Sequence, residues 1–362
     1  MTRRQLAAVL LGACFALPLG AQSVADAAVI AGPQFVQYRF STFGSEKTVS
    51  QFAVPIAVIV PFNDRFNVDV STSYASSEVR FGGAKTSSIS GLTDMQVRGN
   101  LLIGDNVALI TLGLNLPTGM YKVPEGQIEA AGQIGNDFLL YPVASMGGGL
   151  STTGGVAFAQ PLGDWNLGAG ASFRHSSRFD AYQLQSAALR FQPGDELRLR
   201  VGLDRPILDG SMAFGVTYSK FGKDAADSTT FATGDRALAQ ASISVPVGNG
   251  FDLSVSSWDL YRARGERIGA VAPWENVADI TAALGFNVGD IYVQPSAEGR
   301  LWQVDGVHTG TLGNVGVRLR FELGELSVNP SVTYGIGKLY GAADGTSTDV
   351  TGLRGALLIR LR

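Results

Sequence analysis

Apolar and polar side chains alternate along much of the chain, and residues 196–204 show this pattern most clearly. Leu197, Leu199, Val201 and Leu203 occupy the odd positions, while every even position is charged or glycine. Because successive side chains of a β-strand point to opposite faces, this stretch predicts a strand with one apolar and one charged face. In a soluble sheet the apolar face would pack on a core. In a transmembrane barrel it meets lipid, and the charged face meets a wet lumen.

The same alternation recurs from residue 34 to the end of the chain. It is clearest at residues 66–74, 279–288, 314–323 and 326–336. Strands of soluble proteins average about five or six residues, whereas a tilted strand needs about nine to eleven residues to cross a bilayer. The lengths of these segments therefore favour strands that span a membrane.

The links between the segments alternate strictly between short and long. Short links rich in Gly, Asn and Asp lie at residues 63–65, 104–106, 163–164, 208–210, 248–250, 289–290 and 324–325. Long links lie near residues 44–49, 79–90, 121–149, 177–195, 223–235, 265–274, 305–311 and 340–349. Short periplasmic turns and long extracellular loops are typical of an up-and-down outer-membrane barrel. The sequence thus predicts an all-β fold, a transmembrane antiparallel β-barrel of sixteen strands, or of fourteen or eighteen if weak segments are merged or split.

The N-terminus has the pattern of a secretory signal peptide. A positive flank at residues 3–4 precedes an apolar centre at residues 6–19 and a zone of small residues at 21–28. Cleavage is expected after Ala21 or Ala25. Residues 1–25 are then the signal peptide, and residues 34–362 form the barrel.

Composition narrows the class of protein further. Charged residues make up 16% of the chain, below the usual share of about a quarter. After the signal peptide no apolar run reaches the roughly 18 residues of a membrane-spanning helix. The net charge of −3 argues against a nucleic-acid partner. The only cysteine, Cys14, lies in the signal peptide, so the mature chain is expected to have no disulfide.

Three features depart from simple alternation. Pro55, Pro295 and Pro330 lie inside predicted strands, where each removes a ladder hydrogen bond, so we expect bulges or bends there. Trp258 lies on the polar face of its segment and indicates a bulge near residues 256–257. The long link at 121–149 is too apolar for a freely solvated loop, and we expect it to fold inward as a constriction loop.

Two short motifs resemble a known family. Gly-Leu-Thr-Asp at residues 91–94 opens one strand, and Leu-Pro-Thr-Gly at residues 116–119 closes the next. This arrangement resembles the outer-membrane transporters of the MetA-pathway-of-phenol-degradation type, within the group of long-chain fatty-acid (FadL-like) channels. Their first motif has glycine where Thr93 stands here. The resemblance covers roughly residues 66–160 and implies a passive channel for hydrophobic or aromatic compounds.

The alternation of inward and outward side chains along each strand, which we call strand parity, gives candidate pore-lining residues. The charged residues predicted to face the lumen are Arg39, Asp69, Asp94, Arg98, Arg174, Arg198, Arg200, Glu298, Arg300, Arg318, Arg320, Arg354 and Arg360. Arginines concentrate in the last four strands. They either form a basic wall that sets ion preference or pair with carboxylates and brace the barrel, as Glu298 would with Arg300.

Enzymatic chemistry has little support in the sequence. The two histidines, His175 and His308, are far apart, and no cluster fits a triad, a zinc site or a phosphate-binding loop. We expect no catalytic residue, no metal and no cofactor.

The sequence therefore favours a porin-like channel for small solutes in the outer membrane of a Gram-negative-type bacterium. The expected partners are outer-membrane lipid, the barrel-assembly machinery and a small-molecule solute. The sequence leaves open whether the protein forms a homo-oligomer. The alternatives are a non-transport surface barrel (an adhesin or a structural protein), an outer-membrane hydrolase and a soluble all-β domain.

Overall fold

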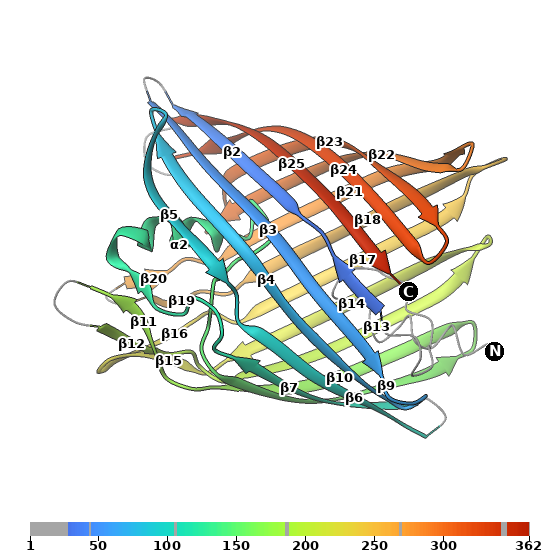
Figure 1. The fold of residues 1–362 in the computed structure, drawn as a ribbon, viewed down its shortest axis with the longest axis horizontal. Coiled ribbons are helices and arrows are strands. Elements are labelled where there is room, and N and C mark those ends of the chain that lie inside the picture. The colour runs from blue at the N-terminus through green and yellow to red at the C-terminus, as the bar shows by residue number, and fades with distance from the viewer. Residues whose placement is uncertain are drawn as a thin grey trace.

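The computed structural model describes residues 28–42, 45–104, 107–184, 188–267, 270–341 and 346–361. They form a closed barrel of sixteen antiparallel strands (Figure 1). The predicted signal peptide, its cleavage sites and Cys14 lie outside the described residues.

Eighteen segments make up the sixteen wall strands, because β1 continues into β2 and β5 into β6, each after a short interruption. The wall segments are β1 (Ala28–Ala31), β2 (Gln34–Thr42), β3 (Ser45–Pro61), β4 (Phe66–Phe81), β5 (Ala84–Leu92), β6 (Met95–Ile103), β7 (Ala108–Leu116), β9 (Ser151–Leu162), β10 (Trp165–Ser176), β13 (Glu196–Ile207), β14 (Gly210–Phe221), β17 (Arg236–Pro246), β18 (Phe251–Arg262), β21 (Glu275–Val288), β22 (Ile291–Val304), β23 (Val307–Leu323), β24 (Leu326–Tyr340) and β25 (Ser347–Leu361). The first wall strand thus begins before residue 34.

Each wall strand pairs with its neighbours in sequence, and the first and last strands close the barrel. Tyr38 of β2 lies opposite Gly352 of β25, and Val29 of β1 lies opposite Leu361. The predicted short turns that the structure describes join the strands at the end of the barrel that holds both described chain ends. Glycines such as Gly163, with φ +62°, supply the left-handed backbone of these turns. The fold class and the count of sixteen strands are confirmed.

The opposite end of the barrel, which we call the open end, differs from the prediction of long loops. Near residues 45–49, 79–90 and 305–311 the strands simply continue. Only residues 82–83 separate β4 from β5, and only residues 305–306 separate β22 from β23. Four other pieces, β11 (Phe179–Gln183), β12 (Ala188–Gln192), β15 (Lys223–Ala226) and β16 (Thr229–Ala232), form hairpins. With β8 (Val123–Pro124) they make a five-stranded sheet, and β19 (Gly265–Arg267) pairs with β20 (Ala270–Ala272). Backbone pairing thus continues beyond the wall in segments whose polar composition indicated loops.

The expected bulges at the prolines and at Trp258 are absent from the described pairings. The β21–β22 pairing keeps one register on either side of Pro295, and the β23–β24 pairing does so on either side of Pro330. Only the pair of the proline itself and one pair beside it are missing in each ladder. Pro55 lies opposite Ser73 in an unshifted ladder. The registers of β18 with β17 and β21 are likewise continuous, so Trp258 points inward without a bulge.

The outer face of the wall is apolar. Leu197, Leu199 and Val201 are 42%, 45% and 52% exposed, as expected for side chains that meet lipid rather than a protein core. The described helices are short, η1 (Glu125–Gln127) and α2 (Ile128–Ile134). Among the described residues no helix is long and apolar enough to cross a membrane.

Candidate functional site

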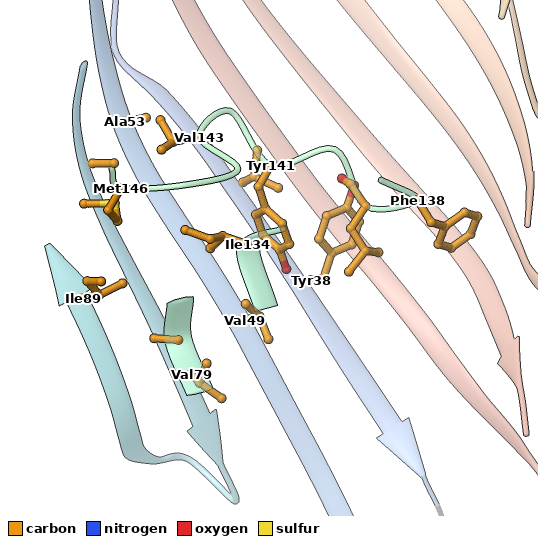
Figure 2. Close-up of a cluster of buried hydrophobic side chains, with 14 of the residues drawn as sticks. Tyr38, Val49, Ala53, Val79, Ile89, Ile134, Phe138, Tyr141, Val143 and Met146 are labelled. Atoms are coloured by element: carbon orange, nitrogen blue, oxygen red, sulfur yellow. The ribbon is translucent and has the colours of Figure 1, made fainter. Parts of the chain in front are cut away.

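The segment between β7 and β9, residues 117–150, folds into the barrel and packs against the inner face of the wall. It carries β8, η1 and α2. Its buried apolar side chains meet inward-facing side chains of β2, β3, β4 and β5, so the barrel contains a small hydrophobic core (Figure 2). The loop residues of this core that Figure 2 labels are Ile134, Phe138, Tyr141, Val143 and Met146. We call residues 117–150 the inward loop.

Polar contacts tie the middle of the inward loop to the wall. Gln51 of β3 makes two hydrogen bonds with Val143: its Nε2 donates to the carbonyl oxygen, and its Oε1 accepts from the amide, both at 2.8 Å. The Tyr38 hydroxyl donates to the carbonyl oxygen of Leu139 at 2.8 Å. Gln51 and Tyr38 are both fully buried. These side chains satisfy backbone groups that the loop would otherwise bury without partners.

A single carboxylate holds the two ends of the inward loop together. Asp94, at the break between β5 and β6, accepts from the Gly119 amide at 3.0 Å and from the Gly148 amide at 2.7 Å. Asn115 donates to the same carboxylate at 2.9 Å. At Gly119 a Cβ atom would lie 2.5 Å from the Asp94 nitrogen and 2.5 Å from the Met146 carbonyl oxygen, so only glycine fits.

The two motifs that carry the family resemblance meet at this junction. Thr93 accepts from the Ser73 amide through its hydroxyl at 2.9 Å. The Thr118 hydroxyl accepts from the Met95 amide at 2.8 Å. The Met120 amide donates to the carbonyl oxygen of Leu92 at 3.1 Å. The motif residues thus join the start of the inward loop to the interrupted strand.

A buried ion network supports the tip of the inward loop. Arg300 is 1% exposed and forms ion pairs with Asp279, at 3.0 Å, and with Glu298. Its Nη1 also donates a hydrogen bond to the carbonyl oxygen of Phe138 at 2.6 Å. Arg354 reaches Glu298 at 3.1 Å. These charges match the bracing alternative rather than a free basic wall. Pairing of this kind is needed because an isolated buried charge is costly.

Among the other candidates, Arg174 and Arg198 share one carboxylate. Both contact Glu196, at 2.9 and 2.7 Å. On β4 and β6, Asp69 accepts from Asn100 at 3.0 Å, and Arg98 lies on the same face as Asn100.

The remaining candidates are distributed over several strands. Arg320 lies 3.7 Å from Glu322 and stacks over the Tyr292 ring, with 4.5 Å between guanidinium carbon and ring centre. By strand alternation Arg200, Arg318 and Arg360 face inward as well. The structure therefore does not gather the candidates into one cluster.

Arg39 does not face the lumen. Its neighbour Tyr38 is completely buried under the inward loop, and the pairing of β2 is regular, so Arg39 points to the outer face. There it lies 3.5 Å from Glu46. The prediction placed Arg39 inward because apolar residues occur on both faces of this strand.

Sequence parity missed three charged wall residues at the end of the lumen opposite the short turns: Arg236, Arg262 and Glu275. Arg262 contacts Asp137 of the inward loop and lies 3.7 Å from Glu275. Arg236 lies directly opposite Arg262 in the barrel sheet. Both arginines stand next to predicted long links. Arg262 could have been found from its even spacing to Trp258 on the same strand, whereas no such signal marks Arg236.

The histidines have separate surroundings. His175 Nδ1 lies 2.7 Å from Asp195 Oδ1, with both side chains about half exposed. His308 Nε2 lies 2.8 Å from the Thr311 hydroxyl. Within the described ranges, no group of three or more His, Cys, Asp or Glu side chains is placed to hold a metal ion.

Comparisons with known proteins point to barrels of low sequence identity. No protein-family model and no curated protein matches the sequence. Among solved structures, the CymD monoaromatic hydrocarbon channel is 8% identical with a TM-score of 0.43, over 92% of this chain and 88% of that one. OccK2 of Pseudomonas aeruginosa is 12% identical with a TM-score of 0.39, over 94% and 100%. OmpT, an outer membrane protein of Vibrio cholerae, is 12% identical with a TM-score of 0.40, over 92% and 100%.

Proposed function

We propose that the protein is an outer-membrane channel through which small solutes pass passively. The observation that carries this proposal is the one-sided filling of the lumen. The inward loop covers the inner face from β18 through β25 to β5, and its partners there include Arg262, Arg300, Tyr38, Gln51 and Ser87. The wall half-way round the barrel, at β13 and β14, receives none of the loop contacts described above.

The uncovered wall carries small side chains on its inner face. These inward residues are Gly155, Ala157, Gly170, Ser172, Gly202, Ala213, Gly215 and Thr217, on β9, β10, β13 and β14. Gly202 and Gly215 lie directly opposite each other, and a Cβ atom on Gly215 would have no neighbour closer than 3.8 Å. We infer that solutes pass between the inward loop and this wall.

The chemistry of the passage supports small, partly polar solutes. Its walls combine small residues with arginines at Arg98, Arg198 and Arg200, whereas the loop presents apolar residues. One of them, Leu140, is 40% exposed with a left-handed φ of 52°. Its neighbours Leu139 and Tyr141 are buried against the wall, so Leu140 points toward the open lumen. The motif resemblance supports hydrophobic or aromatic solutes. A passive channel needs no catalytic residue, so His175 and His308 are given no catalytic role.

Reconstitution tests the proposal directly. Purified protein is refolded, inserted into a planar bilayer for conductance recording, and placed in liposomes with a panel of charged, neutral and aromatic solutes. Stable channels and solute-dependent swelling are expected. A folded barrel that neither conducts ions nor passes any solute would contradict the channel function.

The five-stranded sheet at the open end supports a second candidate, a surface barrel that binds a partner. Phe191 packs against Phe179 at 6.0 Å and against Phe231 at 6.3 Å between ring centres, which stiffens this sheet. A folded barrel without conductance would favour this alternative.

A further inference from the structure

Three neighbouring strands, β17, β18 and β21, stack different chemistries in rows on their inner faces. In the top row, the one nearest the open end of the barrel, Arg236 lies opposite Arg262, and Arg262 lies opposite Glu275. In the row below, Leu238 lies opposite Leu260. Rows of same-facing residues are about 7 Å apart along a strand.

The apolar row continues downward to an aromatic side chain. Val277 lies opposite Leu260, and one row further down Trp258 lies between Gln240 and Asp279. Leu238 and Leu260 are half-buried and stand outside the core that the inward loop covers. An apolar strip therefore leads from the arginine row to the Trp258 indole.

Arg236 has no carboxylate partner among the described residues. The nearest acidic groups are engaged elsewhere: Glu196 pairs with Arg174 and Arg198, whereas Asp137 and Glu275 face Arg262. The guanidinium of Arg236 lies 5.7 Å over the Phe221 ring.

The Nε atom of Arg236 is buried and meets no acceptor within the described part of the chain. A buried donor without an acceptor is costly. Because this atom is buried, an incoming anion would reach the terminal amino groups of the guanidinium and neutralise its charge there.

Space next to the apolar strip is available on the adjacent strand. Thr217 lies opposite Leu238, and Gly215 lies opposite Gln240. Both are small, and a Cβ atom at Gly215 would meet nothing closer than the Val201 carbonyl oxygen at 3.8 Å. A flat apolar body can therefore lie across these rows while its charged end reaches the arginines.

We propose that this wall binds a small amphipathic monoanion, a carboxylate on a flat aromatic or short aliphatic body. The carboxylate accepts hydrogen bonds from Arg236, for which the planar guanidinium is well suited. The body lies on Leu238 and Leu260. Of the two arginines in the row, Arg262 contacts two carboxylates, whereas Arg236 has no carboxylate partner in the part of the chain that the structure describes. One negative charge therefore matches Arg236, and a dianion would be left partly unpaired. This site rests on the proposed channel function and defines the solutes that such a channel would concentrate at its entrance.

Binding in detergent tests the site without requiring conduction. Benzoate is titrated into the refolded barrel by calorimetry, with benzyl alcohol and acetate as probes that lack the charge or the apolar body. Benzoate is expected to bind more tightly than either. Arg236→Gln is expected to weaken benzoate binding by about tenfold or more, since hydrogen bonds to a charged group are among the stronger ones. Arg39→Gln removes an outer-face arginine and is expected to leave binding unchanged.

A second variant keeps the site testable if Arg236→Gln does not fold. Thr217→Trp fills the space beside Leu238 and leaves Arg236 and Arg262 in place. Its other neighbour across the sheet, Arg200, lies outside the proposed site. The variant is expected to abolish benzoate binding in a folded barrel. Benzoate that fails to bind the wild type, or that binds the wild type and both variants equally, overturns the site. A barrel that binds benzoate but shows neither conductance nor flux into liposomes would contradict the channel function and leave the site intact.

Discussion

Gln51 and Val143 face each other inside the barrel as if they formed one step of a β-ladder. The side-chain amide of Gln51 both donates to and accepts from the Val143 backbone, at 2.8 Å in each direction. A wall side chain thus replaces a missing strand partner. This pair lies in the middle of the inward loop and holds it against β3.

Replacing Gln51 by Leu keeps the approximate size of the side chain but removes both hydrogen bonds. The Val143 backbone groups are then buried without partners, at a cost of about 1–3 kcal/mol. The loop should detach more often, and single-channel records should become noisier with brief openings to higher conductance. Gln37→Leu, on the neighbouring strand, is the control. Records that match the wild type would show that this pair does not hold the loop.

Asp94 is expected to set the geometry of both loop ends. Asp94→Ala leaves the Gly119 and Gly148 amides without their acceptor, and each loss costs about 1–3 kcal/mol. Limited proteolysis should cut the inward loop faster, while the wall strands stay protected. Asp209→Ala, in a short turn, serves as the control. Equal cleavage rates in Asp94→Ala and the wild type would refute this role.

Arg300 is expected to be critical for stability rather than for ion preference. Arg300→Ala leaves the buried Asp279 carboxylate without its arginine, while Glu298 keeps only Arg354 as a cationic partner. Breaking a buried pair in this way costs about 3–5 kcal/mol. Denaturant unfolding of the refolded barrel measures the loss. The double variant Arg318→Ala with Arg320→Ala should unfold like the wild type, because both arginines are more exposed. A stable Arg300→Ala barrel would argue against the network.

The outward assignment of β13 is tested at Val201. Val201→Arg places a charge on the apolar face and should reduce the free energy of unfolding by about 2–4 kcal/mol near the bilayer midplane. Ala213→Arg, on the inner face opposite Asp204, should be nearly neutral. Equal stability of the two variants in lipid would overturn the assignment of the faces.

Strand parity predicted the faces well wherever the lumen is wet. Leu197, Leu199 and Val201 alternate with charged residues, because lipid and water set opposite preferences on the two sides. The turns were equally predictable, since short links rich in glycine, asparagine and aspartate permit little else.

Parity failed where the inward loop covers the wall. At Tyr38 and Trp258 the inner surface is itself apolar, so the alternation carries no information about which face is inside. This explains both the wrong placement of Arg39 and the bulge expected near Trp258. Only the fold of residues 117–150, through contacts distant in sequence such as Tyr38 with Leu139, decides the matter.

The open end was hard to predict for a different reason. Residues 177–195 and 223–235 are polar enough to indicate loops, yet they pair into hairpins above the wall. Backbone hydrogen bonds with neighbouring segments stabilise them, and local composition does not reveal those neighbours.

Deletion of residues 125–140 tests the central claim, a channel narrowed by an inward loop, most directly. Single-channel conductance of the refolded deletion variant is compared with that of the wild type in the same planar bilayer, after both have been shown to form closed barrels. We expect a conducting wild type and a clearly larger conductance in the variant, because α2 and the loop tip no longer occupy the lumen. Unchanged conductance, or a wild-type barrel that does not conduct at all, would contradict it.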